Sequence, residues 1–238
     1  MNDPVGIPVV IPTLNPGAAL PPLVAEVLRG GAAEVIVVDD GSTADDAKKF
    51  LAEAAALPGC RLLRHPANRG KGAALKSAWR FCLETGGRSG IVTADDDGQH
   101  TAQDILRIRA ALRMKPDALI LGSRDFSRRS VPWRSRFGNR LTSLVFRRFA
   151  GIAVGDTQTG LRGIPRRLAD AMLELPGDGF ELETEMLLAA AEIPLPIVET
   201  PIETVYIAGN SGTHFHPLRD AFRIYGAIAR HLGRKGGR

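Results

Sequence analysis

Residues 34–42 read EVIVVDDGS, and residues 90–97 read GIVTADDD. Each stretch is a short apolar run, rich in β-branched residues, that ends in adjacent aspartates; this pattern favours a buried strand followed by a polar loop. Three similar runs predict further strands at residues 7–14, 61–64 and 117–123. Segments between the runs predict helices at residues 18–29, 45–56, 71–83 and 102–114. This alternation predicts an α/β fold in which helices flank a mostly parallel central sheet.

The C-terminal half follows a different pattern. Apolar residues recur at helical spacing from Trp133 to Phe149, with arginines between them, which predicts an amphipathic helix. The elements expected after it are a Gly/Thr-rich loop at residues 155–160, a short strand, a helix over residues 183–191, strand-like stretches within residues 196–206 and a last helix over residues 217–232. No linker divides the chain, so we expect one domain over residues 1–232 and a basic, flexible tail at residues 233–238.

The composition is that of an ordinary folded protein. The chain has 238 residues, of which 44% are hydrophobic and 24% charged, so disorder and a small disulfide-linked scaffold are excluded. It has two cysteines, Cys60 and Cys82, no apolar leader at its start and no run of about 18 apolar residues. We therefore expect a cytoplasmic protein with free thiols and no membrane-spanning segment.

Positive charge is concentrated in one segment. The chain as a whole has 31 basic and 26 acidic residues, a net charge of +5. Between Arg124 and Arg148, eight arginines accompany a single acid, Asp125. Such a local basic patch suits a phosphate-rich ligand, anionic lipid headgroups or nucleic acid.

Three adjacent carboxylates follow the strand predicted at residues 90–94. Asp95, Asp96 and Asp97 repel one another, which raises their pKa values unless a cation neutralises them. Asp95 and Asp97 can converge on one ion after a turn, and Gln99 adds an amide oxygen. Oxygen ligands of this kind suit Mg²⁺ or Mn²⁺ bound to phosphates. The alternative is a solvated acidic turn before the next helix, but the position at the end of a strand favours the metal site.

Two more polar stretches lie next to predicted elements. Asp39 and Asp40 end the second strand, where carboxylates can bind the base or ribose of a nucleotide; a turn with Ser42 as a helix cap is the alternative. Residues 68–72, NRGKG, precede a helix, where glycines and the helix N-terminus can hold an anion. A plain glycine-rich connector is the alternative for that loop.

Basic and acidic residues flank two later elements. Arg124 follows Gly122 and Ser123 at the end of a predicted strand, and its guanidinium fork matches phosphate oxygens, as do those of Arg134 and Arg136. A solvated basic face is the alternative for this region. Residues 180–185, FELETE, begin a helix, where acids are also the ordinary partners of the helix dipole.

In this order, the motifs resemble those of family 2 inverting glycosyltransferases, which have the GT-A fold with a Rossmann-like sheet. Among them the sequence is most similar to the polyisoprenyl-phosphate glycosyltransferases, typified by dolichol-phosphate mannose synthases. The matching segments are residues 9–15, 37–42, 68–72, 95–100, 122–124, 156–162, 180–185 and 201–202. The resemblance covers nearly the whole chain, and its strength lies in the ordered set rather than in any one motif.

The resemblance implies a role for each candidate residue. The residues implied to bind the nucleotide-sugar are Pro12, Thr13, Asn15, Asp39, Asp40, Lys71, Asp95 and Asp96. The residues implied to ligate Mg²⁺ or Mn²⁺ are Asp95, Asp97 and Gln99, and those implied in catalysis are Asp97, Gln99 and Arg124. The residues implied to bind acceptor or donor phosphate are Arg124, Arg134, Arg136, Glu183 and His214, the last in place of a basic motif of the family. The nucleotide-binding half then spans about residues 5–125, and the acceptor-binding half, with amphipathic interface helices, about residues 126–232.

The implied activity is metal-dependent, inverting transfer of a hexose from a nucleotide-sugar of the GDP-mannose or UDP-glucose type to a polyprenyl or dolichyl phosphate. Such an enzyme works at the cytoplasmic face of the membrane, to which the arginine-rich helix binds it peripherally. A separate integral membrane protein is a candidate partner, and nucleic acid is not expected to bind.

Other activities stay open at this point. A sugar hydroxyl as acceptor requires a carboxylate base, for which Glu181, Glu183 and Asp156 are the candidates. A sugar-1-phosphate nucleotidyltransferase would use a similar sheet and release pyrophosphate, but it gives no reason for the arginine-rich helix. A non-catalytic phosphate binder is disfavoured, because carboxylates at strand ends repel phosphates when no metal is bound.

Overall fold

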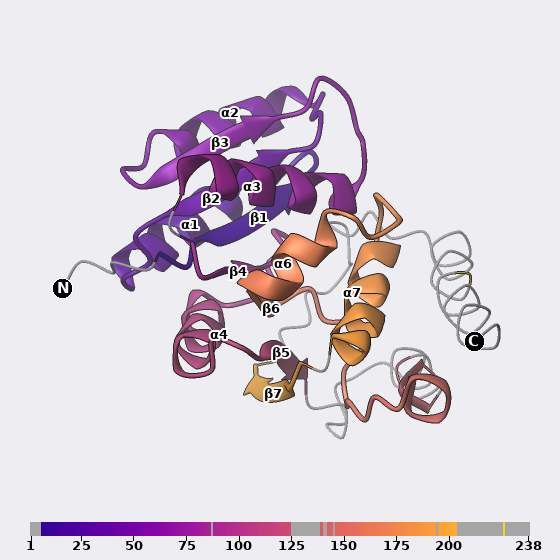
Figure 1. The fold of residues 1–238 in the computed structure, drawn as a ribbon. Coiled ribbons are helices and arrows are strands. Elements are labelled where there is room, and N and C mark those ends of the chain that lie inside the picture. The colour runs from indigo at the N-terminus through magenta and orange to yellow at the C-terminus, as the bar shows by residue number, and fades with distance from the viewer. Residues whose placement is uncertain are drawn as a thin grey trace.

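The computed structural model describes residues 6–86, 88–124, 139, 142–144, 146–193, 195–203 and 226. Its centre is a seven-stranded sheet with the strand order β3-β2-β1-β4-β6-β5-β7 (Figure 1). The strands are β1 (Val9–Thr13), β2 (Val35–Asp39), β3 (Cys60–Arg64), β4 (Gly90–Thr93), β5 (Leu119–Arg124), β6 (Arg162–Pro165) and β7 (Ile197–Ile202). Only β6 among them runs antiparallel to its neighbours, so the expectation of a mostly parallel sheet is confirmed.

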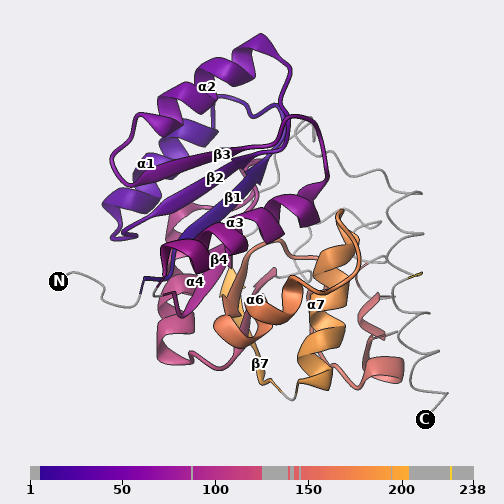
Figure 2. The same cartoon turned by 45° about the horizontal axis from the view of Figure 1, so that its top comes forward.

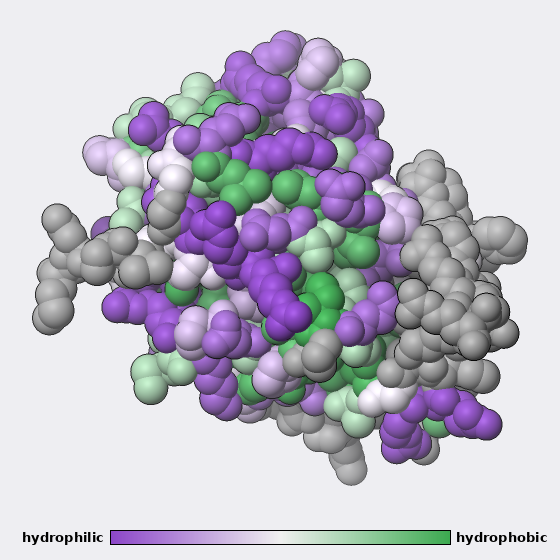
Figure 3. Space-filling view, viewed as in Figure 1, coloured by the Kyte–Doolittle hydropathy of each residue, from purple (hydrophilic) through white to green (hydrophobic). Residues whose placement is uncertain are grey.

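Helices cover both faces of this sheet (Figure 2). The helices are α1 (Leu20–Arg29), α2 (Asp45–Ala55), α3 (Lys71–Thr85), α4 (Ala102–Met114), η1 (Phe146–Ala150), α6 (Arg166–Met172) and α7 (Glu181–Glu192). One face packs against α1, α2 and α4, and the other against α3, α6 and α7. Polar side chains cover most of the described surface on the face with α3 and α6 (Figure 3), as expected of helices that turn their apolar sides to a sheet.

Two hydrophobic cores result from the alternation of side chains along the strands. In β1, Val10 belongs to the core beneath α3, α6 and α7, whereas Val9 and Ile11 belong to the core beneath α1 and α4. Trp79, which is fully buried in α3, is the largest side chain of the first core, and its indole N–H donates to Asp170 Oδ1 at 3.0 Å. Both faces of the central strands are thus apolar, and polar side chains are left to the strand ends.

The elements predicted in the first half are confirmed, with ends shifted by a few residues. The helix predicted from residue 18 begins at Leu20, and the helix predicted to end at residue 83 continues to Thr85. The strand-like stretches around Pro201 form a single strand, β7, at the edge of the sheet, where a proline costs no ladder hydrogen bond. Helix α6 was not predicted, because it has seven residues and no side-chain cap.

Several expectations for the C-terminal half fall on residues outside the described ones. Of the amphipathic helix predicted at residues 133–149, residues 142–144 are helical and η1 is a π-helical turn. Phe146 of that segment is buried and Leu144 is half exposed. The helix predicted at residues 217–232, apart from residue 226, and the tail at residues 233–238 lie outside the described chain. Within the described chain, each helix is too short or too polar to cross a bilayer.

Candidate active site

The predicted site lies where β1, β2 and β4 end. Thr13, the last residue of β1, donates its hydroxyl hydrogen to the carboxylate of Asp96, which follows β4. The carbonyl of Thr13 also accepts the Asp40 N–H at 2.8 Å, just beyond β2. Because these strands are parallel neighbours, their polar ends meet at one edge of the sheet, as the sequence predicts.

Lys71 joins this edge to the C-terminal half of the chain. It is the first residue of α3, its side chain is 12% exposed, and its ammonium lies 2.5 Å from Asp95 Oδ1 and 2.8 Å from Glu183 Oε1. Its Nζ also lies 5.4 Å from the centre of the Phe180 ring. Burial alone would lower the pKa of Lys71, but the two carboxylates outweigh it and raise that pKa above its usual range. Lys71 is therefore a permanent cation between two acids.

The three aspartates after β4 differ in charge balance. Burial would raise the pKa of Asp95, but Lys71, followed by His100 and Arg124, lowers it, to about 2. Burial raises the pKa of Asp96 to about 6, despite its bond from Thr13, and the charge of Asp95 adds to the rise. Burial, with the charge of Asp95, also raises the pKa of Asp97. Negative charge is thus neutralised at Asp95 and poorly compensated at its two neighbours.

A tight turn shapes the same loop. Gly98 has a φ of +77°, and Asp97 Oδ1 accepts the N–H of Gln99 at 3.0 Å. The Asp95 N–H donates to His100 Nδ1 at 3.1 Å, and burial of that imidazole lowers its pKa, which favours the neutral ring. The backbone of the loop is therefore held by its own side chains.

The donor set fits a small, hard cation. Carboxylate oxygens carry the poorly compensated charge described above, and such oxygens are the ligands that Mg²⁺ and Mn²⁺ prefer. Within the described part of the chain, no group of three or more His, Cys, Asp or Glu side chains is arranged as a metal cage. The fit is thus to an ion that takes few protein ligands and keeps positions open for phosphate or water.

Asp39, Asp40 and Asn15 all hold loops at this edge. Asp40 accepts the N–H groups of Arg69 at 3.0 Å and Gly70 at 2.7 Å, and its Oδ1 lies 2.6 Å from His65 Nδ1. Asp39 Oδ1 accepts the Ser42 N–H at 2.8 Å. The helix cap expected of Ser42 is not formed, since no side chain caps α2; Asn15 Oδ1 instead accepts the N–H groups of residues 43 and 44, just before that helix, at 2.9 and 3.0 Å.

The described N–H bonds of the glycine loop before α3 go to groups of the chain itself. The N–H groups of Arg69 and Gly70 bind Asp40, and the N–H of Ala73 donates to the carbonyl of Asp178 at 3.0 Å. A Cβ on Gly72 would lie 2.8 Å from the Asp178 carbonyl carbon, and one on Gly70 would collide with the Asp178 carbonyl oxygen. These glycines therefore allow close approach of the chain's own backbone, as in the connector alternative.

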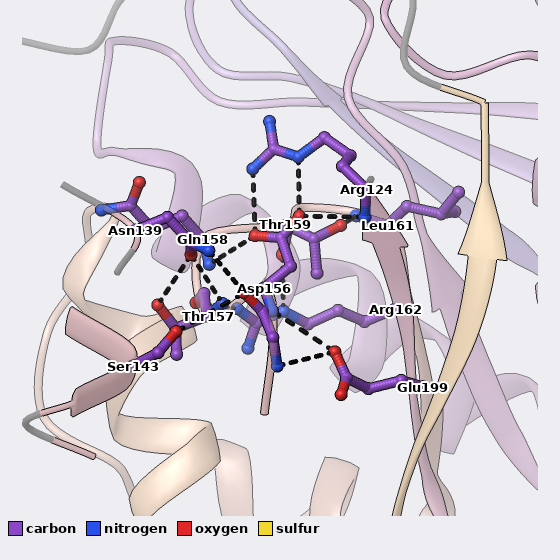
Figure 4. Close-up of polar contacts among 11 residues, drawn as sticks. Arg124, Asn139, Ser143, Asp156, Thr157, Gln158, Thr159, Leu161, Arg162 and Glu199 are labelled. Atoms are coloured by element: carbon purple, nitrogen blue, oxygen red, sulfur yellow. Dashed lines mark hydrogen bonds and ion pairs between the residues drawn. The ribbon is translucent and has the colours of Figure 1, made fainter. Parts of the chain in front are cut away.

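Arg124 forms an ion pair that the sequence did not predict (Figure 4). Its Nε and Nη2 atoms lie 2.7 and 3.1 Å from Oδ2 and Oδ1 of Asp156, which is fully buried. Glu199 Oε1 accepts the N–H groups of Gly155 at 2.9 Å and Asp156 at 3.3 Å, which anchors the loop to β7. The pair fixes the guanidinium of Arg124 at the end of β5, on the edge where Asp95 lies.

Arg162 is the second residue that sequence reasoning missed. It begins β6, has no exposed surface, and donates only to backbone carbonyls among its described partners. Its motif, residues 156–162, was noticed as a resemblance, but neither composition nor spacing indicated a buried guanidinium. The available signal was an arginine within a short apolar stretch, between Leu161 and Gly163.

The structure therefore brings together part of the predicted set. Thr13, Asp96, Asp95, Lys71 and Glu183 form a connected series of contacts. Pro12 lies within buried β1 and Gln99 within the turn after β4. Arg134, Arg136 and His214 lie outside the described residues.

The fold of the chain is found in a known class of enzyme, the GT-A glycosyltransferases. The structure is similar to that of glucosyl-3-phosphoglycerate synthase from Mycobacterium tuberculosis, crystallised with Mn²⁺, UDP and glucosyl-3-phosphoglycerate. The TM-score is 0.69 at 19% identity, and the match covers 96% of this chain and 80% of that one. This likeness confirms the GT-A fold.

The family model for glycosyl transferase family 2 matches residues 9–172, and the chain belongs to that family. It is 27% identical over 216 residues to UDP-N-acetylglucosamine–dolichyl-phosphate N-acetylglucosaminyltransferase of Methanococcus voltae, covering 83% of this chain and 84% of that protein. It is 32% identical over 172 residues to undecaprenyl-phosphate 4-deoxy-4-formamido-L-arabinose transferase of Pseudomonas paraeruginosa, covering 70% of this chain and 49% of that protein. The protein is a family 2 glycosyltransferase whose relatives transfer sugars to polyprenyl phosphates.

Proposed function

We propose that this glycosyltransferase moves a sugar from a nucleoside diphosphate donor to the phosphate of a polyprenyl phosphate, with inversion at the anomeric carbon and with Mg²⁺ or Mn²⁺ as cofactor. The observation that carries the proposal is the cluster of three aspartates, residues 95–97, at the end of β4, beside the cations Lys71 and Arg124, each of which is held by carboxylates of the chain. The polyprenyl-phosphate relatives support the acceptor.

Asp95, Asp97 and the amide oxygen of Gln99 are the residues that would hold the ion. When bound, a divalent ion supplies a Lewis acid that neutralises charge on the donor's diphosphate. The structural neighbour glucosyl-3-phosphoglycerate synthase was crystallised with Mn²⁺ and UDP and with Mg²⁺ and UDP, which supports a divalent ion and a nucleoside diphosphate as ligands.

The nucleotide is assigned to the ends of β1 and β2. Pro12 and Thr13 would line its pocket with Asp39, whose carboxylate lies at the strand end. Asp40 and Asn15 would shape that pocket, since their side chains hold residues 69–70 and 43–44. A UDP-linked hexose or N-acetylhexosamine is the first donor to test, because the name of the M. voltae relative includes UDP-N-acetylglucosamine and the structural neighbour was crystallised with UDP.

Arg124 and Lys71 would act on the phosphates as fixed charges. Asp156 holds Arg124 through two nitrogen atoms, so its guanidinium does not have to be reorganised when negative charge grows on the leaving diphosphate. Lys71 is held between Asp95 and Glu183 in the same way. Arg134, Arg136 and His214 would contact the acceptor phosphate from the C-terminal half.

A phosphate acceptor suits the state of the carboxylates. A lipid phosphate is an anion near neutral pH, so it needs positioning against the anomeric carbon more than it needs a base. A sugar hydroxyl acceptor would need a general base, but Asp156 is paired with Arg124 and Glu183 is paired with Lys71. Two of the three candidate bases are thus held as ion pairs.

The place of the reaction follows from the acceptor. A polyprenyl chain stays in the bilayer, so the enzyme would bind peripherally at the cytoplasmic face, with the arginine-rich segment at residues 124–148 towards anionic lipid. A separate integral membrane protein is a further proposed partner.

The test is release of nucleoside diphosphate. The protein is incubated with UDP-glucose, UDP-N-acetylglucosamine or GDP-mannose, with and without undecaprenyl or dolichyl phosphate, in Mn²⁺ or in EDTA. We expect release with one donor that depends on both the lipid phosphate and the metal. Release of pyrophosphate from a nucleoside triphosphate and a sugar phosphate, or turnover with a sugar hydroxyl and no lipid phosphate, would contradict the proposal.

A further inference from the structure

Arg162 lies beneath the candidate active site without reaching its surface. It is fully buried at the start of β6, where it pairs with Thr93 of β4. Its Nε donates to the Thr159 carbonyl at 2.8 Å and its Nη2 to the Thr157 carbonyl at 3.3 Å (Figure 4). Its Nη1 donates to the Glu183 carbonyl at 2.6 Å. One guanidinium thus ties the loop before β6 to the first turn of α7.

The hydrogen bond from Arg162 to Glu183 connects Arg162 with Asp95 through Lys71. Nη1 fixes the backbone of Glu183, whose carboxylate lies 2.8 Å from Lys71 Nζ. Lys71 in turn lies 2.5 Å from Asp95 Oδ1. A shift of the α7 backbone at residue 183 would therefore move the cation that neutralises Asp95.

The hydrogen bonds from Arg162 to the loop before β6 provide a second connection to Asp95. Thr157 and Thr159 lie just before Gly160, whose carbonyl accepts the Thr93 hydroxyl at 2.8 Å. A Cβ on Gly160 would collide with the Asp95 carboxylate, so the loop backbone packs directly on that side chain. The loop also begins with Asp156, the partner of Arg124.

A buried guanidinium is costly unless its surroundings compensate the charge. Three carbonyl oxygens accept from Arg162, and the carboxylates of Glu183, Asp156 and Asp95 are the charges that favour its cationic form against the effect of burial. The cation is therefore placed among the acids of the site rather than at a structural position remote from it.

We propose that Arg162 is a positioning residue of the glycosyltransferase: its guanidinium holds the 157–159 loop and the start of α7 together, and so sets the positions of Asp95, Lys71 and Arg124 relative to one another. The effect on turnover rests on the proposed function, whereas the effect on the two backbone segments does not.

The test compares Arg162→Lys and Arg162→Gln with a matched control, Arg109→Lys. Arg109 is also buried and also donates to backbone carbonyls, of Ile7 at 2.9 Å and Gly31 at 3.2 Å, but these lie before β1 and β2 at the opposite edge of the sheet. Each protein is measured for hydrogen–deuterium exchange, for Mn²⁺-dependent UDP binding by calorimetry, and for kcat and KM with the donor found for the wild type.

We expect both Arg162 variants to exchange faster at residues 156–161 and 181–185 together. UDP binding in Mn²⁺ should weaken, and kcat should fall by about tenfold or more, because displacement of reacting groups by a fraction of an ångström has effects of that order. Arg162→Lys should recover part of the loss seen in Arg162→Gln. Arg109→Lys should change exchange near residues 7 and 31 but leave UDP binding and kcat unchanged.

Two results would overturn the inference. One is faster exchange in only one of the two segments, and the other is a folded Arg162→Gln protein with wild-type UDP binding and kcat. If Arg162→Gln fails to fold, the same measurements are made on the less disruptive Arg162→Lys protein at a temperature below its unfolding midpoint, where the same outcomes apply. Failure of the proposed function would give a different result, because the wild type itself would then neither bind UDP with Mn²⁺ nor turn over. Hydrogen–deuterium exchange in the Arg162 variants would still decide whether Arg162 holds the two backbone segments.

Discussion

At the scale of single residues, the aspartates after β4 are chemically unequal although they are adjacent in sequence. Asp95 has an ammonium partner in Lys71, Asp96 a hydroxyl partner in Thr13, and Asp97 only the backbone of its own turn among the bonds described above. The sequence predicted that acids here would meet a cation. It could not predict that Lys71 and Glu183 would share one ion pair, because that contact depends on where two distant helices begin.

Glu181 tests whether the reaction needs a base. One of its oxygen atoms, Oε2, is buried without a hydrogen-bond partner among the described residues, and it is the candidate base that no ion pair holds. With a phosphate acceptor we expect Glu181→Gln to keep kcat within about threefold, because the nucleophile is already ionised. A rate of diphosphate release lower by a hundredfold or more, restored at high pH, would show a base and contradict the phosphate acceptor.

The two thiols should be unreactive in the folded protein. Burial raises the pKa of Cys60 and of Cys82 to about 11, from a reference value of 9.0. Because the thiolate is the reactive form, alkylation by iodoacetamide at pH 8 should be about 100-fold slower than in urea-unfolded protein. Equal rates, followed by mass spectrometry of each cysteine, would show that the fold does not raise the pKa values of these thiols.

The raised pKa values of the two thiols make the stability of the fold depend on pH. A folded-state pKa above the unfolded value means that the protonated thiol is favoured in the fold. This contribution is complete below pH 9 and is lost as the pH rises towards 11. We therefore expect the Cys60→Ser variant to lose less stability than the wild type between pH 9 and 11, measured by urea unfolding.

At the scale of elements, the strands and helices of the first half followed from local pattern, and the contacts between elements did not. Short β-branched runs predicted β1, β2, β4 and β5 because both faces of a central strand are buried. Helix α6 was not predicted, because seven residues are too few to show a helical periodicity in the sequence. The sequence of the glycine loop before α3 fits both an anion site and a plain connector, and it does not reveal that Gly70 and Gly72 lie against the backbone of Asp178.

That loop gives a prediction about stability. Gly70 has a φ of +102° and faces the Asp178 backbone, whereas Gly86 has a φ of +77° and open space around it. Gly86→Ala should therefore cost about 1 kcal/mol of unfolding free energy for its backbone strain alone. Gly70→Ala should cost clearly more, since it adds a collision with backbone. Equal midpoints in urea for the two variants would show that residues 70 and 178 are not in contact.

At the scale of the whole molecule, the site is built from residues of both halves of the sequence. Thr13 and Lys71 come from the first half of the chain, while Asp156, Arg162 and Glu183 come from the second. The antiparallel strand β6 brings them together, because it places the loop before it against Asp95, which follows β4. The sequence indicated a mostly parallel sheet and the edge that carries the site. The inserted strand, and the buried Arg162 with it, required the structure.

The central claim is that the carboxylates after β4 hold a divalent ion that binds the diphosphate of the donor. Calorimetric titration of UDP, with Mn²⁺ and then with EDTA, into the wild type and Asp97→Asn tests it most directly, with the exposed Asp45→Asn as the control. We predict binding to the wild type and the control that weakens by about tenfold or more in EDTA and by a similar factor in Asp97→Asn, because the lost ligand leaves diphosphate charge unneutralised. UDP affinity that is the same with Mn²⁺ and with EDTA, and the same in Asp97→Asn, would contradict the account.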